Sequence, residues 1–157
     1  MPPFGPSDLT ETRCSVAVFR GDSLLLVGSE EDGLEVWKLP GGHLHADEGL
    51  IACARRELRE ESGLTAGTLH CAFVLDVHDK DTGRYMIEII LVPSEPVTGE
   101  PRECEAGRTP RFVPMNELPQ LVLRPTENDY LYALHDLHRG ETEEPPPAGP
   151  TVQGVVR

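Results

Sequence analysis

The chain has 157 residues, and its 14 Lys and Arg against 27 Asp and Glu give a formal net charge of −13. This length suits one domain, and no apolar run approaches the roughly 18 residues of a membrane span. With so few cations, the protein is not expected to bind the phosphate backbone of a long nucleic acid. The N-terminus lacks a secretory signal and the four cysteines form no CxxC pair, so we expect a cytoplasmic protein with reduced thiols.

Alternating or continuous apolar runs, bounded by glycine, proline and acidic turns, predict strands. In chain order these cover residues 13–20, 23–29, 34–40, 69–79, 84–94 and 111–114. Helical spacing and end signals predict helices at 47–62, capped by Asp47, and at 125–139, with Pro125 in its first turn, and a turn of helix at 115–121. This mixture predicts one α+β domain over residues 12–139 in α/β/α layers, and the ends, 1–11 and 140–157, are expected to be disordered.

The first predicted helix carries like charges on one ridge. On a helical wheel, the residues expected to face the core are Leu50, Ile51, Ala54 and Leu58, and those expected in water are Arg55, Arg56 and Arg59. Glu57 and Glu61 border the apolar arc, with Glu60 beside them, and such carboxylates repel one another. A solvated acidic face would explain them, but Mg²⁺, which bridges carboxylates to phosphates, resolves the repulsion at a half-buried position. The preceding Gly41-Gly42 turn would let the backbone approach such a site.

The stretch from Gly42 to Leu64 resembles the Nudix hydrolase signature, G-x5-E-x7-R-E-U-x-E-E-x-G-U, where U is a bulky aliphatic residue. The matching residues are Gly42, Glu48, Arg56-Glu57-Leu58, Glu60-Glu61 and Gly63-Leu64. The resemblance implies a Nudix fold with a mixed, curved sheet, and hydrolysis of a nucleoside diphosphate linked to another group with Mg²⁺ or Mn²⁺. It implies a small nucleotide as the partner, and because relatives are often dimers, a homodimer is one possible assembly; charge and hydropathy argue against a long nucleic acid or a membrane as partners.

The resemblance also implies roles for single residues. The implied metal ligands are Glu57, Glu60, Glu61, Gly41 through its carbonyl, and Glu105, and the implied structural salt bridge joins Glu48 to Arg56. Glu60 would be the general base, with Glu57 as the alternative. Glu103, in the same long loop as Glu105, and Glu88, in the preceding strand, are alternatives for the further carboxylate.

Three residues are candidates for binding substrate. The amide of Gly42 could bind phosphate oxygens, Asn128 resembles a base-recognising asparagine or binds its own backbone, and Trp37 either stacks on a base or belongs to the core. Missing hallmarks of other subfamilies favour a MutT-like enzyme, which would convert a (d)NTP or an oxidised nucleotide to the monophosphate and pyrophosphate. The alternatives are a hydrolase of ADP-ribose or nucleotide sugars, a non-catalytic nucleotide sensor, and an isomerase of isopentenyl diphosphate.

Overall fold

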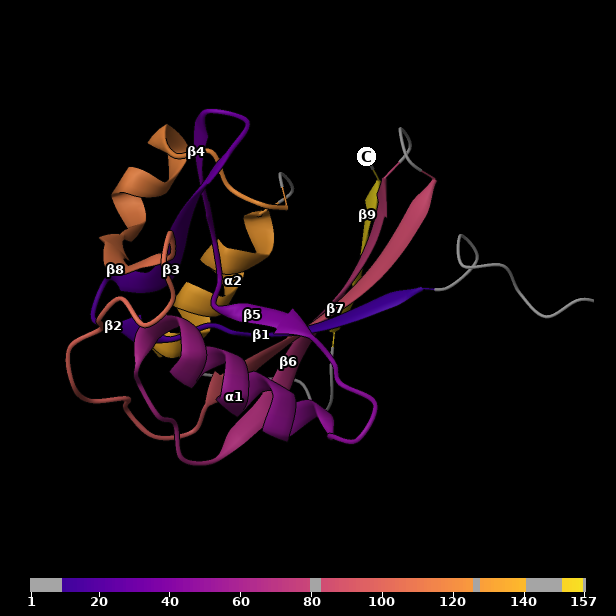
Figure 1. Ribbon diagram of the computed structural model, residues 1–157. Coiled ribbons are helices and arrows are strands. Elements are labelled where there is room, and N and C mark those ends of the chain that lie inside the picture. The colour runs from indigo at the N-terminus through magenta and orange to yellow at the C-terminus, as the bar shows by residue number, and fades with distance from the viewer. Residues whose placement is uncertain (1–9, 80–82, 126–127, 141–150, 157) are drawn as a thin grey trace, which may run out of the picture.

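The computed structural model describes residues 10–79, 83–125, 128–140 and 151–156, and Figure 1 shows its elements. The strands are β1 (Glu11–Val16), β2 (Phe19–Arg20), β3 (Ser23–Glu31), β4 (Leu34–Lys38), β5 (Gly41–His43), β6 (Leu69–Asp79), β7 (Arg84–Pro93), β8 (Thr109–Pro114) and β9 (Thr151–Val156). The helices are α1 (Leu50–Ser62), the 3-10 helix η2 (Met115–Gln120) and α2 (Asp129–His138). No helix in these ranges is long and apolar enough to cross a membrane.

Two sheets form the framework of the fold. The larger sheet has five strands in the order β5-β1-β7-β6-β9. Within it, β1 runs parallel to β7 and β9 runs parallel to β6, whereas β5 with β1 and β6 with β7 are antiparallel. In the second sheet β3 lies between β4 and β8, and it also pairs with β2. The mixed sheet predicted from the sequence is therefore confirmed.

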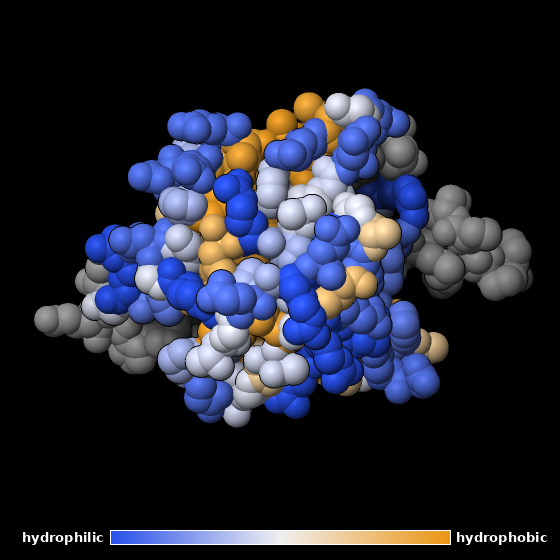
Figure 2. All heavy atoms as spheres, turned by 60° about the vertical axis from the view of Figure 1, so that its left-hand side comes forward, coloured by the Kyte–Doolittle hydropathy of each residue, from blue (hydrophilic) through white to orange (hydrophobic). Residues whose placement is uncertain are grey.

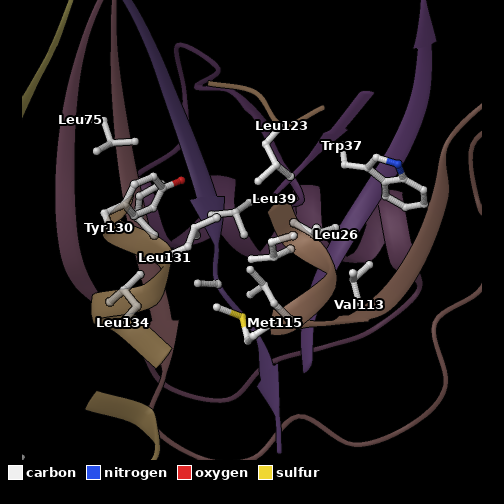
Figure 3. Packing of buried hydrophobic residues seen from close by; sticks show 14 of the residues in the cluster. Leu26, Trp37, Leu39, Leu75, Val113, Met115, Leu123, Tyr130, Leu131 and Leu134 are labelled. Carbon is white, nitrogen blue, oxygen red and sulfur yellow. The ribbon is translucent and has the colours of Figure 1, made fainter. Parts of the chain in front are cut away.

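Each of the two longer helices contributes to a different hydrophobic cluster. The cluster of α1 joins that helix to β1 and β7 through fully or nearly fully buried residues, among them Cys14, Val16, Cys53, Ala54, Leu58 and Leu91. In the other cluster, Tyr130, Leu131 and Leu134 of α2 lie with Leu75 of β6 and Leu26 of β3 (Figure 3). Hydrophilic side chains cover much of the face seen in Figure 2. This arrangement of helices about a sheet is the α/β/α layering expected from the sequence.

Several predicted strands match the structure closely, and others do not. The strands expected at 69–79 and 84–94 correspond to β6 and β7 within one residue. The strand expected at 13–20 is divided between β1 and β2, which belong to different sheets. The three-residue strand β5 was not predicted, because two consecutive glycines favour a turn and only pairing with β1 makes them extended.

The C-terminal part of the chain requires two corrections. The prediction of disorder over 140–157 is wrong for residues 151–156, because β9 pairs with β6 along its length. The last helix begins at Asp129 with Asn128 at its N-cap, so Pro125 precedes the helix and does not lie in its first turn. Residues 1–9, 141–150 and 157, which were also expected to be disordered, lie outside the described residues.

The boundaries and the buried face of α1 differ from the prediction. The helix begins at Leu50 with Gly49 at its N-cap, so the expected start at 47 and the Asp47 cap are wrong. Its C-terminus at Gly63, which has a left-handed φ of 75°, was predicted correctly. Leu50 and Ile51 are 39% and 45% exposed rather than buried. They lie in the first turn, whereas the buried apolar residues Cys53, Ala54 and Leu58 lie further along the helix.

This difference along α1 gives a first prediction. Leu58 is fully buried, so Leu58→Ala should lower the free energy of unfolding by about 2–5 kcal/mol through lost burial and a residual cavity. Ile51→Ala on the same helix should change it by no more than about 0.5 kcal/mol, because Ile51 is 45% exposed. Urea unfolding of both variants measures the difference. Equal effects would contradict the packing of α1 described here.

Candidate active site

The two glycines of β5 are tightly enclosed. Antiparallel pairing sets Gly41 opposite Ser15 and Gly42 opposite Cys14 on β1. A Cβ on Gly41 would lie only 2.6 Å from the carbonyl oxygen of Cys14, and one on Gly42 would lie 2.7 Å from Oε2 of Glu57. At Gly41 the backbone of β1 blocks any side chain, and at Gly42 a side chain would displace the carboxylate of Glu57. The glycines therefore bring the backbone of β5 directly against the carboxylates of α1.

Glu61 is the most enclosed carboxylate of this site. It is 4% exposed, and its Oε1 accepts a hydrogen bond of 3.3 Å from the backbone N–H of Gly41. Its Oε2 is buried and has no hydrogen-bond partner within the described part of the chain. Burial, together with the neighbouring carboxylate of Glu57, raises the pKa of Glu61 to about 7, although the hydrogen bond from Gly41 opposes this shift. The structure thus places a carboxylate where its ionised form is only partly compensated.

Arg56 is the centre of an ion-pair network. Its Nη2 lies 2.7 Å from Oε1 of Glu48 and its Nε lies 3.0 Å from Oε2, which forms the implied salt bridge in bidentate geometry. Its Nη1 also lies 2.8 Å from Glu57 and 3.2 Å from Glu60. The hydrogen bond to Arg56 lowers the pKa of Glu48 to about 2. Only 19% of the Arg56 side chain is exposed, so the expectation that it points into water is wrong.

The carboxylates have the chemistry of a magnesium site. A hard divalent cation takes oxygen ligands, and Mg²⁺ commonly uses one or two carboxylates together with substrate phosphates. Glu57 and Glu61 meet at the Gly41-Gly42 pair of β5, and the unpartnered Oε2 of Glu61 is an available ligand atom. Across the described residues, no three His, Cys, Asp or Glu side chains already form a metal-binding group.

Two other predicted metal ligands lie further from this pair. Glu60 is 44% exposed and turns its carboxylate toward Arg56. Glu105 is exposed in the loop before β8, where its carbonyl accepts a hydrogen bond from the backbone of Arg108, and the structure does not bring its carboxylate to Glu57 and Glu61. The alternative Glu103 accepts a hydrogen bond from the N–H of Gly107 and so stabilises the turn in that loop.

The predicted substrate-binding residues lie in different environments. Trp37 is only 5% exposed, its indole N–H donates to Glu35, and the guanidinium of Arg111 covers its ring, so Trp37 is a core residue in this structure. Asn128 lies at the N-terminus of α2, and its carbonyl accepts a hydrogen bond from Leu131. Its recognition of a base remains a prediction.

The sequence analysis missed Ser15, which lies at the base of the site. Ser15 is fully buried and lies against Gly41, and its hydroxyl donates a hydrogen bond of 2.5 Å to Oε1 of Glu88. Glu88, the sequence-based alternative for the further carboxylate, thus has a hydrogen-bond partner in the structure. A single serine in an alternating strand gives no signal of its own, because the parallel pairing of β1 with β7 creates the contact.

Comparisons with known proteins show the family to which the chain belongs. The chain matches the family model described as NUDIX domain over residues 10–146, and because this match spans most of its length, the protein belongs to the Nudix family. Phosphatase NudJ of Escherichia coli (strain K12) is 46% identical over 46 residues, which are 29% of this chain and 30% of that protein. The chain therefore aligns with less than a third of the length of that relative.

Solved structures resemble the whole fold. A MutT NUDIX hydrolase from Burkholderia pseudomallei has a TM-score of 0.66 at 25% identity, over 76% of this chain and 94% of that chain. The NUDIX domain of Shewanella oneidensis NrtR, in complex with ADP ribose, has a TM-score of 0.68 at 17% identity, over 88% of this chain and 94% of that chain. The second likeness shows the fold alone.

Proposed function

We propose that this protein is a metal-dependent pyrophosphohydrolase that cleaves a nucleoside diphosphate linked to another group. The observation that carries the proposal is the pair of Glu57 and Glu61 at Gly41 and Gly42 of β5, with Oε2 of Glu61 buried and lacking a partner in the described residues. A stable fold gains nothing from such an arrangement, since a buried carboxylate without compensation costs free energy. A bound divalent cation would compensate it.

Each residue of the site has a proposed role in the reaction. Glu57, Glu60 and Glu61 would hold Mg²⁺ or Mn²⁺, which would neutralise the pyrophosphate and acidify a water molecule. Glu60 is our candidate for the base that accepts the proton of the attacking water, because its 44% exposure lets it reach the solvent side of the site. Glu57 is the second candidate. Arg56 pairs with the carboxylates of both Glu57 and Glu60. The backbone amide of Gly42, which is buried in β5 beside Glu57, is our candidate for a contact with a phosphate oxygen.

The substrate we propose is a (d)NTP or an oxidised nucleotide, with the monophosphate and pyrophosphate as products. The missing subfamily hallmarks and the likeness to a MutT hydrolase support this class. The complex of the NrtR NUDIX domain with ADP ribose favours the second candidate, a protein that hydrolyses or only binds ADP-ribose. The intact set of Glu57, Glu60 and Glu61 supports hydrolysis over binding alone.

One assay tests these assignments. The protein is incubated with ordinary and oxidised dNTPs, ADP-ribose, NADH, nucleotide sugars and dinucleoside polyphosphates, with Mg²⁺, with Mn²⁺ or with a chelator, and the products are identified by mass spectrometry. We expect the protein to cleave one class of these substrates with Mg²⁺ or Mn²⁺, and we expect the chelator to abolish this cleavage. If a nucleotide binds and none is cleaved under any condition, the protein is a sensor.

Removing the proposed base gives a sharper prediction. Glu60→Gln should lower kcat by about 10²–10⁴-fold, because a positioned general base contributes that much, while the melting temperature stays close to that of the wild type. Steady-state kinetics on the substrate found in the assay measures the loss. Glu57→Gln is the comparison, and unchanged kcat in Glu60→Gln with a large loss in Glu57→Gln would assign the base to Glu57.

A further inference from the structure

Three cations come together beside the carboxylates of the candidate active site. They are Lys38 at the end of β4, Arg13 on β1 and Arg108 just before β8. The strand β3 lies between β4 and β8, and its Val27 is opposite both Lys38 and Pro110, which brings the end of β4 close to the start of β8. Arg13 is opposite His43 in β5, the strand that follows β4. Chain segments far apart in the sequence thus converge at this point.

These cations have no direct ion-pair partner in the described ranges. All three are partly buried, and in the described ranges their side chains make no hydrogen bond and no ion pair with the protein. Burial and the charges of Arg13 and Arg108 lower the pKa of Lys38, while the more distant carboxylates of Glu61 and Glu31 act in the opposite direction. By contrast, Arg20, Arg84 and Arg124 each have a carboxylate partner. A cation cluster without direct ion pairs is unexpected in a chain with 27 acidic residues.

We propose that Lys38, Arg13 and Arg108 bind the terminal phosphates of a nucleoside triphosphate, and that this cluster makes the site select triphosphates over diphosphates esterified at both ends. The proposal rests on the hydrolase function proposed above. Lys38 lies three residues before Gly41, which contacts Glu61. Arg13 is opposite His43, directly after Gly42, which contacts Glu57. The cluster therefore lies beside the carboxylate pair, where a phosphate chain extending from the metal site would reach it. A terminal phosphate carries about −1.5 to −2 charges and an esterified one fewer, so several cations favour the triphosphate.

The test compares the two substrate classes in charge-removing variants. Lys38→Met, Arg13→Gln and Arg108→Gln are assayed with dGTP and with ADP-ribose, at low and high salt. Each variant should raise KM for dGTP by about 10-fold or more, with a weaker salt dependence, while kcat for dGTP and the kinetics for ADP-ribose change little. Lys38→Arg should restore most of the affinity. Arg59→Gln, which removes an exposed charge from α1, is the matched control.

Each remaining outcome has a defined meaning. An equal rise in KM for dGTP and for ADP-ribose would overturn the selectivity proposed for the cluster. A fall in kcat with unchanged KM, or unchanged KM values in all three variants, would overturn it as well. If the wild type cleaves neither substrate, the hydrolase proposal fails separately. Calorimetry with inorganic tripolyphosphate and Mg²⁺ then tests whether the cation cluster binds phosphates. Binding that Lys38→Met and Arg108→Gln abolish would support the phosphate site, and equal binding by the wild type and the variants would overturn it.

Discussion

Glu61→Gln is expected to lose metal-dependent hydrolysis by about 100-fold or more and yet to unfold, without metal, at a higher temperature than the wild type. The loss follows because the variant lacks a principal metal ligand. The gain follows because the amide removes a buried carboxylate whose Oε2 has no partner in the described residues and whose neighbour is Glu57. Activity and thermal unfolding with a chelator present measure the two effects.

The gain in stability should depend on pH. The pKa of Glu61 is raised from 4.5 to about 7, so the folded protein binds more protons than the unfolded chain between these values. The stability of the metal-free wild type therefore falls as pH rises through this window, and Glu61→Gln should remove that fall. Mg²⁺ should raise the melting temperature of the wild type and not of the variant. The exposed Glu30→Gln is the control, and a variant less stable than the wild type at about pH 8 would contradict this account.

Gly42→Ala is expected to disable the site while leaving the fold in place. The added Cβ would overlap the carboxylate of Glu57, which must then leave its position at the turn. Because Glu57 is a proposed metal ligand, affinity for Mn²⁺ should fall by roughly 10–100-fold, with at least a similar loss of activity. Isothermal titration with Mn²⁺ and steady-state kinetics measure these losses.

Gly49→Ala is the matched control for this substitution. A Cβ on Gly49 would meet no atom within 4 Å, and its φ of −83° is accessible to alanine. The control should keep wild-type metal affinity and activity, apart from a small effect at the helix N-cap. Equal losses in the two variants would show that the loop before α1, rather than the contact of Gly42 with Glu57, controls the site.

The sequence predicted the local part of the site and not its surroundings. The fixed spacing of Glu57 and Glu61 along α1 predicts their proximity from helical periodicity alone. The bidentate pair of Glu48 and Arg56 followed from the resemblance to the Nudix signature, since the helical wheel had placed Arg56 in water. The wheel failed for Ile51, which is 45% exposed, because periodicity gives the direction of a side chain and not what the rest of the fold packs against it.

Long-range contacts explain most of the remaining differences. The partnership of Ser15 with Glu88 depends on the parallel pairing of β1 with β7, which the pattern of each strand alone does not specify. The strand β9 contains a glycine and follows a proline-rich segment, so its composition favours disorder, and only its pairing with β6 orders it. Trp37 next to the Gly-Gly turn could equally contact a base or the core, and the second sheet decides for the core.

The order β5-β1-β7-β6-β9 also has a consequence for how the molecule folds. The hairpin of β6 and β7 is bordered on one side by β1 and on the other by β9, and both outer pairings are parallel. Parallel strands cannot meet through a tight turn, so each pairing must close a loop spanning about half of the chain. Such non-local contacts slow folding. During synthesis, the hairpin can form first and pair with β1, which has already been synthesised. The strand β9 can join the sheet only when residues 151–156 have left the ribosome.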